Sequence, residues 1–221
     1  MDTAKKAAGK AAVEYIQPDM RVGLGTGSTV AYFLEHLGQR CREGLNIIAV
    51  ASSIDTAKKA KQLGIPLEEG DWKETLDITV DGADEVDPHK RLIKGGGGAL
   101  LREKMIAYHS NRTLIIVDEN KLVHQLGGFK LPVEVAPFGH LATQHSIQTL
   151  GVDAELRLSE HKPYITDNGN YILDLNIRNY PAIDLLDERL HKIPGVVETG
   201  LFLDLASLVL VGYADGTVKL V

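Results

Sequence analysis

Cysteine is almost absent from this sequence. The 221 residues contain one, Cys41, so the chain can form no internal disulfide, a usage typical of proteins in a reducing compartment. The N-terminal residues, MDTAKKAAGKAAVEYI, are amphipathic and lack a long apolar core, so they predict neither a signal peptide nor a membrane span. We therefore expect a cytoplasmic protein that has no membrane partner.

Positive charge is also in short supply. Lysine and arginine number 24 against 30 aspartates and glutamates, which gives a formal net charge of −6. No block of lysines or arginines occurs, so the sequence carries no electrostatic footprint for nucleic acid. A small anionic ligand would have to be held by a few local lysines instead.

Motifs for common cofactors do not match either. The eight histidines show no metal-ligand spacing. The segment GLGTGST, residues 23–29, has no glycine at the third, helix-packing position of a dinucleotide fingerprint, and the following apolar strand ends in Ala51-Ser52-Ser53 without an acid for a ribose hydroxyl. Neither this segment nor KGGGGALLREK, residues 94–104, contains the Gly-Lys-Ser/Thr of a Walker A loop.

The sequence does contain a regular alternation of apolar and helix-forming segments up to about residue 117. Helices are expected at residues 2–16, 30–37, 56–63 and 99–107. Strands are expected at residues 22–24, 47–51, 76–80 and 113–117. Strands that alternate with helices predict an α/β fold with a doubly wound, mostly parallel, Rossmann-like sheet.

The pattern changes after residue 127. The expected strands here begin near residue 133 and continue at 154–158, 164–166, 171–175 and 196–200, with helices at 141–150 and 182–190. Asn168-Gly169 predicts a hairpin between two of these strands. A final hairpin, at 208–213 and 217–220, is expected to return to the first domain. We therefore expect a Rossmann-like catalytic domain (1–127 and 203–221) and an inserted, smaller α+β lid or oligomerisation domain (128–202).

The first glycine loop joins an expected strand to an expected helix. The start of a helix presents backbone N–H groups and a positive dipole end to an anion. Hydroxyl groups stand at the same place in the sequence, on Thr26, Ser28 and Thr29. We weighed a glycine turn with only a packing role and favour a cradle for a phosphate or sugar oxygen, formed with Gly27.

Residues 81–104, DGADEVDPHKRLIKGGGGALLREK, hold the densest group of reactive side chains. Asp81 and Asp84 follow an expected strand, at the edge where open α/β sheets hold their ligands. Lys94 precedes four glycines (the glycine run, residues 95–98), whose backbone can approach a ligand closely. Glu103 lies in the helix that follows. This combination of charge, hydrogen-bond donors and a candidate base indicates a functional site.

Other interpretations of these residues stay open at this level. Asp81 and Asp84 could hold Mg²⁺, because carboxylates at strand ends are frequent ligands of that ion. Glu103, in the context LREKM, is by itself more typical of a solvated helix position. Lys121 alone is equally unspecific.

Taken in order, the motifs resemble ribose-5-phosphate isomerase of the A type. The matching segments are GLGTGSTV (23–30), ASSIDTA (51–57), DGADEVD (81–87), IKGGGGALLREK (93–104), Lys121, LPVEV (131–135), TDNGN (166–170) and IPGVVETGLF (193–202). They extend over nearly the whole chain in the family's order, which makes the resemblance far more specific than any single glycine loop.

The resemblance implies reversible isomerisation of D-ribose 5-phosphate and D-ribulose 5-phosphate in the non-oxidative pentose phosphate pathway, without metal or organic cofactor. Glu103 would be the general base that carries a proton between C2 and C1 through a cis-enediolate. Asp81, Asp84 and Lys94 would open the furanose ring and handle protons on O1 and O2.

The resemblance also implies a set of substrate-binding positions and an assembly. The positions are Thr26, Gly27, Ser28, Thr29, Asp81, Gly82, Ala83, Asp84, Lys94, Gly95, Gly96, Gly97, Lys121 and, as a weaker candidate beside Lys6, Lys5. Members of the family are homodimers or dimers of dimers.

Two functions of other classes were weighed against the isomerase. A non-catalytic sugar-phosphate sensor would carry a DNA-binding helix-turn-helix and a basic face, and the N-terminus of this acidic chain shows neither. A nucleotide- or acyl-CoA-dependent transferase with a related sheet would retain bound nucleotide after purification.

Overall fold

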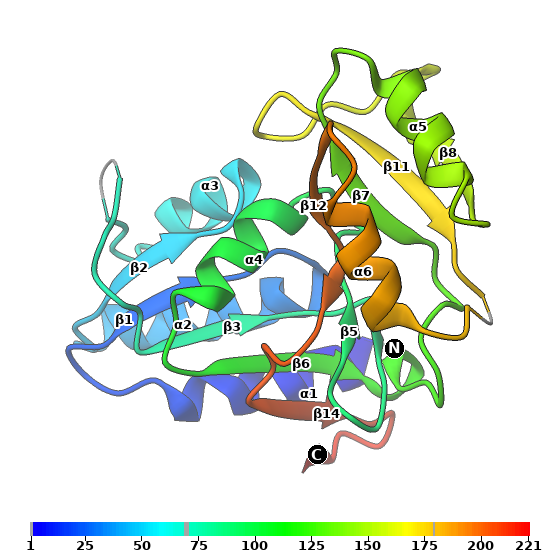
Figure 1. The fold of residues 1–221 in the computed structure, drawn as a ribbon. Coiled ribbons are helices and arrows are strands. Elements are labelled where there is room, and N and C mark those ends of the chain that lie inside the picture. The colour runs from blue at the N-terminus through cyan, green and yellow to red at the C-terminus, as the bar shows by residue number, and fades with distance from the viewer. Residues whose placement is uncertain (1, 69–70, 179) are drawn as a thin grey trace. The chain divides into compact units, whose positions relative to one another are not determined.

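The computed structural model describes residues 2–68, 71–178 and 180–221, which form two compact units (Figure 1). The first unit comprises Met1–Ala83, Arg102–Leu122 and Asp204–Val221. The second comprises Asp84–Leu101 and Val123–Leu203.

The first unit is built on a six-stranded sheet in the order β15-β14-β6-β3-β1-β2. Its strands are β1 (Arg21–Leu24), β2 (Ile48–Ala51), β3 (Ile78–Asp81), β6 (Thr113–Asp118), β14 (Leu208–Gly212) and β15 (Val218–Leu220). All neighbouring strands are parallel except β14 and β15, which form an antiparallel edge. The predicted α/β class with a mostly parallel sheet is confirmed, and the final hairpin does return to the first sheet.

Helices cover both faces of this sheet, as a doubly wound fold requires. They are α1 (Asp2–Ala12) with the 3₁₀ turn η1 (Val13–Tyr15), α2 (Ser28–Arg42), α3 (Ile54–Gln62), α4 (Leu100–Tyr108) and the 3₁₀ turn η2 (Glu119–Lys121). In Figure 1, α1 and α2 lie behind the sheet and α4 lies in front of it. On the α4 side, Ile106 packs with Val50 and Leu76.

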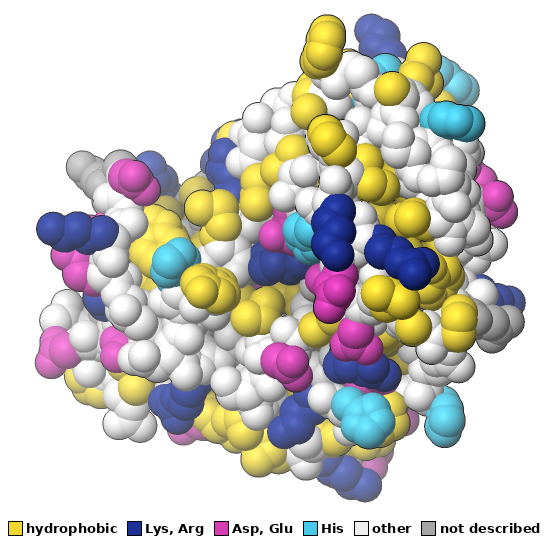
Figure 2. Space-filling view, in the orientation of Figure 1, with side chains coloured by type: hydrophobic (Ala, Val, Ile, Leu, Met, Phe, Trp, Pro, Cys, Tyr) yellow, Lys and Arg dark blue, Asp and Glu magenta, His cyan; other side chains and the backbone are white. Residues whose placement is uncertain are grey.

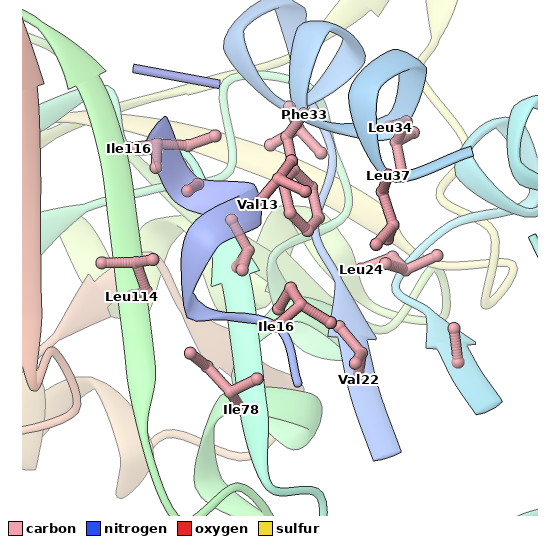
Figure 3. Packing of buried hydrophobic residues seen from close by; sticks show 14 of the residues in the cluster. Val13, Ile16, Val22, Leu24, Phe33, Leu34, Leu37, Ile78, Leu114 and Ile116 are labelled. Carbon is pink, nitrogen blue, oxygen red and sulfur yellow. The ribbon is translucent and has the colours of Figure 1, made fainter. Parts of the chain in front are cut away.

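The main core of the first unit lies between the sheet and the first two helices. Alternate residues of a strand point to the same face, so Val22 and Leu24 of β1 face the helices together with Ile78 and Leu114 of the neighbouring strands. Phe33 of α2 points into this layer from the helix side (Figure 3). This packing fixes the strands whose ends carry the candidate residues.

The second unit contains a four-stranded antiparallel sheet in the order β12-β7-β11-β8. Its strands are β7 (Leu131–Val135), β8 (Asp153–Leu156), β11 (Tyr171–Asn176) and β12 (Val196–Thr199), and its helices are α5 (His140–Gln148) and α6 (Ile183–His191). Leu131, Val133, Leu173, Leu186 and Leu190 belong to one buried cluster between the sheet and the helices.

Short strands complete the second unit. They are β4 (Glu85–Val86), β5 (Leu92–Ile93) and β13 (Leu201–Phe202) in one sheet, and β9 (Leu158–Ser159) and β10 (Lys162–Pro163) in a hairpin. Residues 84–101 were expected in the first domain. Here β5 pairs with both β4 and β13, and these strand pairs hold that segment in the second compact unit.

The hairpin predicted at Asn168-Gly169 is wrong. Residues 164–166 form no strand, and β11 pairs with β7 and β8 instead. The turn that joins β9 to β10 lies at Glu160 and His161, which both have positive φ. The physical reason is side-chain chemistry: Thr166 and Asn170 donate hydrogen bonds to the buried carboxylate of Glu134, at 2.9 Å each, and such polar contacts compete with strand pairing.

The surface carries charges of both signs. Acidic and basic side chains are interspersed on the face drawn in Figure 2, and ion pairs such as Lys59–Asp55 and Lys130–Glu155 join some of them. Within the described residues, no helix is both long and apolar enough to cross a lipid bilayer.

Candidate active site

The candidate residues are distributed over both units. The first unit holds Lys5, Thr26, Gly27, Ser28, Thr29, Asp81, Gly82, Ala83, Glu103 and Lys121, and the second holds Asp84, Lys94, Gly95, Gly96 and Gly97. In the first unit, β1, β3 and β6 are adjacent and parallel. The residues that follow them therefore emerge at one edge of the sheet, which is where open α/β sheets bind ligands.

Asp81 ends the central strand β3 and is 2% exposed. Its Oδ1 accepts hydrogen bonds from the backbone N–H of Thr26, at 3.0 Å, and of Gly82, at 2.7 Å. A Cβ on Gly25 would lie 2.0 Å from that same oxygen. The carboxylate of Asp81 thus rests against the first glycine loop and joins β3 to the loop after β1.

The first glycine loop leads directly into α2. Gly27 caps the helix with φ of 137°, a conformation that favours glycine, and Ser28 is the first helical residue. The ammonium of Lys5, from α1, donates to Ser28 Oγ at 2.9 Å. A lysine thus lies beside a helix N-terminus, which combines two features that bind anions. The contact favours Lys5 over Lys6.

The hydroxyl of Thr26 does not serve the helix start as the sequence suggested. Its Oγ1 lies within 2.8 Å of Ser52 Oγ and Ser53 Oγ and within 3.0 Å of Thr56 Oγ1. These four residues form a hydroxyl cluster, in which Thr56 also donates to the carbonyl of Gly25 at 2.9 Å. The cluster links the first glycine loop to the N-terminus of α3, where Ser53 is the N-cap and its Oγ accepts from the N–H of Thr56 at 3.0 Å.

Glu103 lies on α4 and is 4% exposed. Taken alone, its sequence context favoured a solvated position, and the structure buries it. Carboxylates are rarely buried unless they are paired or take part in a functional site. Lys121 closes η2, just beyond the carboxyl end of β6, and is half-buried.

In the second unit the glycine run forms a tight turn beside Asp84. The N–H of Gly98 donates to the carbonyl of Gly95 at 2.9 Å. The N–H of Gly96 donates to Asp84 Oδ2 at 2.7 Å. Lys94, which precedes the turn, is 3% exposed, and its Nζ lies 5.4 Å from the centre of the Phe202 ring. The structure therefore brings Asp84 into direct contact with the glycine run.

Two side chains that the sequence analysis missed also contact the glycine run. Arg157 Nη1 donates to the carbonyls of Gly95 and Gly96, at 2.9 and 3.1 Å. The hydroxyl of Tyr164 donates to the carbonyl of Gly97 at 3.2 Å. Both residues flank the β9–β10 hairpin, a stretch with no motif that would single them out.

The described part of the chain contains no group of three or more His, Cys, Asp or Glu side chains placed to hold a metal ion. One oxygen of Asp81 and one of Asp84 accept backbone N–H donors. Both carboxylates are thereby bound to the backbone of the glycine loops beside them.

Comparison with known proteins resolves the family. The model of ribose 5-phosphate isomerase A (phosphoriboisomerase A) matches residues 48–216. The chain belongs to the ribose 5-phosphate isomerase A family. A relative named "Ribose-5-phosphate isomerase A" from Jannaschia sp. (strain CCS1) is 48% identical, and the match covers 99% of this chain and 87% of that protein. A relative of the same name from Protochlamydia amoebophila is 46% identical, and the match covers 99% of this chain and 95% of that protein.

Solved structures of ribose 5-phosphate isomerases agree with this assignment. The enzyme from Plasmodium falciparum superposes with a TM-score of 0.96 at 37% identity, covering 100% of this chain and 98% of that one. A D-ribose-5-phosphate isomerase in complex with phospho-erythronic acid has a TM-score of 0.92 at 41% identity, covering 98% and 96%.

Proposed function

We propose that this protein interconverts D-ribose 5-phosphate and D-ribulose 5-phosphate as an aldose-ketose isomerase of the non-oxidative pentose phosphate pathway. Membership of the ribose 5-phosphate isomerase A family supports the substrate. The burial of Glu103 supports the catalytic role: this carboxylate, 4% exposed, lies on the helix that begins just past the glycine run.

The reaction needs one base and stabilisation of one developing oxyanion. The C2 proton of the open-chain aldose is weakly acidic, so a base must remove it while donors stabilise the charge that moves to O1. Glu103 takes this proton, the C2–H electron pair forms the C1–C2 double bond, and a cis-enediolate results. The carboxylic acid then returns the proton to C1 as O2 becomes the carbonyl oxygen. The sugar as a whole is neither oxidised nor reduced.

The remaining charged residues divide the other tasks. Lys94 and amides of the glycine run donate hydrogen bonds to the enediolate oxygens. Asp81 and Asp84 move protons between the ring oxygen, O1 and O2 during ring opening and isomerisation. These roles rest on the family resemblance and on the chemistry of each side chain.

The phosphate group is assigned to the start of α2. Ser28 and Thr29 open that helix, and the contact of Lys5 with Ser28 places a cation beside it. A phosphate gains there from backbone N–H groups, from the helix dipole and from one ammonium. Lys121 is a further cation that we assign to substrate binding.

The cellular context belongs to the same proposal. We place the enzyme in the cytoplasm, where the sequence's single cysteine would stay reduced. We also propose that it assembles as a homodimer or a dimer of dimers, as the family resemblance implies.

The decisive test is ketose formation from ribose 5-phosphate by the purified protein in EDTA, without added cofactor. We expect turnover by the wild type and a loss on the order of 10²-fold or more in kcat for Glu103→Gln, which keeps the shape and removes the base. Glu35→Gln is the matched control because Glu35 is an exposed glutamate on a helix, α2. It should leave kcat unchanged.

Three outcomes would contradict the proposal in different ways. Near-normal turnover of Glu103→Gln would remove Glu103 from the role of base. A folded wild type that binds ribose 5-phosphate without forming ketose would favour a sensor. Activity that disappears only on adding EDTA would make Asp81 and Asp84 candidate metal ligands.

A further inference from the structure

Arg157 contacts the glycine run from the side of its carbonyl groups. Its Nη1 is shared between the carbonyl oxygens of Gly95, at 2.9 Å, and Gly96, at 3.1 Å. Its other donors are held by Asp174, whose Oδ2 accepts from Nε at 2.9 Å and whose Oδ1 accepts from Nη2. A guanidinium fixed by a bidentate carboxylate is a rigid donor, because the planar fork can adopt one orientation.

The peptide between Gly95 and Gly96 connects Arg157 to Asp84. A trans peptide is planar, and its C=O and N–H point in opposite directions. In the peptide that joins Gly95 to Gly96, the C=O faces Arg157 and the N–H donates to Asp84 Oδ2 at 2.7 Å. Arg157 and Asp84 therefore hold the two ends of one peptide dipole, and each hydrogen bond polarises the group that makes the other.

The next peptide has the same orientation. The carbonyl of Gly96 accepts from Arg157, so the N–H of Gly97 points away from the guanidinium. The carbonyl of Gly97 accepts from Tyr164, and the N–H of Gly98 closes the turn onto Gly95. All three carbonyls of the turn are thus bound, and the direction of the Gly97 N–H is set by the carbonyl contacts.

Asp84 and Tyr164 lie so close to the glycine run that they leave no room for side chains on Gly96 and Gly98. A Cβ on Gly96 would lie 2.6 Å from Asp84 Oδ1, and a Cβ on Gly98 would lie 2.3 Å from the Tyr164 hydroxyl. Gly95 and Gly98 also have φ of 98° and 81°, in the region that favours glycine. The run is therefore required by its contacts with Asp84 and Tyr164 as well as by its backbone.

A second buried group supports the Tyr164 contact. Glu134, which is fully buried, accepts at Oε1 from Thr166 Oγ1 at 2.9 Å and from Asn170 Nδ2 at 2.9 Å. These bonds fix the loop that starts just after Tyr164. The Tyr164 ring in turn lies 5.9 Å from the Arg157 guanidinium.

From these contacts we infer that Arg157 is a positioning residue for catalysis: it orients the Gly95–Gly96 peptide and, through it, the carboxylate of Asp84. The inference rests on the proposed function, since Asp84 matters to turnover only if it handles protons in the isomerase reaction. Tyr164 has a smaller part, because it fixes one carbonyl by a neutral hydrogen bond.

The kinetic test is a double-mutant cycle between Arg157 and Asp84. We expect Arg157→Gln to lower kcat about tenfold with a KM change below about threefold, because the proposed phosphate site at the start of α2 is unchanged. In the Asp84→Asn background the same substitution should cost less than about threefold, because the group that Arg157 positions is already lost. A merely structural role would give the same cost in both backgrounds.

Lys130→Gln is the matched control. It also removes one positive charge and one ion pair from the second unit, that of Lys130 with Glu155 on β8 at 2.6 Å. Both side chains of that pair are largely exposed, and kcat should stay at the wild-type value. If Arg157→Gln melts well below the wild type, Arg157→Lys replaces it. One ammonium cannot pair twice with Asp174 and still reach both carbonyls, so a similar loss is expected.

An independent measurement needs no turnover. The amide resonance of Gly96 in a ¹H–¹⁵N spectrum reports its short hydrogen bond to a carboxylate. We expect it to move upfield in Arg157→Gln and in Asp84→Asn, and to stay in place in Lys130→Gln. An unmoved Gly96 resonance in Arg157→Gln, or equal kinetic costs in both backgrounds, would overturn the inference. If the wild type forms no ketose at all, the proposed function fails, and the resonance still decides whether Arg157 orients this peptide.

Discussion

Gly25 shows at the scale of one residue how a missing side chain positions a functional group. The carboxylate of Asp81 occupies the space in which a Cβ of residue 25 would stand, 2.0 Å from Oδ1. We therefore expect Gly25→Ala to displace Asp81 and to lower kcat/KM by about 10²-fold, since misplacement of this size disrupts catalytic geometry. Steady-state kinetics beside a thermal melt would check this. A folded variant with normal kcat/KM would show that Asp81 tolerates the shift.

A second prediction at this scale concerns Lys5, and the neighbouring Lys6 is its control. Lys5 contacts Ser28 at the start of α2, and Lys6 is exposed on α1. If Lys5 binds phosphate, Lys5→Ala should raise KM for ribose 5-phosphate on the order of tenfold, the effect of one charge-assisted hydrogen bond. Lys6→Ala should leave KM unchanged. Equal effects of the two substitutions would assign the role to general charge.

Some site residues could be found from the sequence and others could not. Asp81 and Glu103 stand in a continuous motif beside the glycine run, so their neighbours in the sequence indicate their importance. Arg157 lies 62 positions from Gly95, and no local pattern indicates that its guanidinium reaches a glycine carbonyl. For Thr26 the sequence indicated the wrong partner. Its hydroxyl was expected at the start of α2, and it contacts instead the hydroxyls of residues 52, 53 and 56, which follow β2.

At the scale of elements, strands and helices with strong apolar patterns were predicted well. The strand predicted at residues 113–117 is β6 (Thr113–Asp118), and the helix predicted at 182–190 is α6 (Ile183–His191). The strand predicted at 164–166 failed because the buried carboxylate of Glu134 attracts polar side chains that a local pattern reads as turn formers. The periodicity of apolar residues along the chain cannot reveal a contact with a residue this distant in sequence.

The link between α6 and β12 predicts a pH-dependent stability. His191, on α6, donates from Nε2 to Glu198 Oε1 at 2.9 Å, and its Nδ1 contacts the carbonyl of Asp187 at 2.9 Å. The hydrogen bond with Glu198, more than any other contact, raises the pKa of His191 to about 8. The pKa of His191 in the folded protein lies above the ordinary 6.5. The stabilisation that the protonated imidazole gains from Glu198 is therefore fully present below pH 6.5 and is lost as the pH rises through 8.

Urea denaturation of the wild type and of His191→Gln at several pH values would measure this effect. We expect a difference in unfolding free energy of about 1 kcal/mol at pH 6, after allowance for solvent screening of a partly exposed imidazole. The difference should vanish above about pH 9, where the imidazole is neutral in both states. A difference that stays constant with pH would mean that packing alone is responsible.

At the scale of the whole molecule, the proposed function requires an acidic chain to bind an acidic substrate. The net charge of −6 repels a sugar phosphate at long range, while Lys5, in the role that we propose for it beside α2, would attract the phosphate at contact. At about 0.1 M salt the screening length is already about 10 Å, so further salt acts mainly on the close attraction. We therefore expect KM to rise between about 0.1 and 0.5 M NaCl while kcat holds. The rise should be shallower in Lys5→Ala; equal slopes in both proteins would count against Lys5.

The order of strands in the first sheet has a consequence for how the protein is made. Strand β14 (Leu208–Gly212) pairs with β6, and it is synthesised after the whole of the second unit. Until then the nascent chain exposes one edge of β6, an unpaired strand edge of the kind that recruits other chains. The second unit, by contrast, is complete once Leu203 has emerged. A chain that stalls between Leu203 and β14 should therefore carry a folded second unit and a first sheet with an unpaired, aggregation-prone strand edge, so the synthesis of β14 is decisive for solubility.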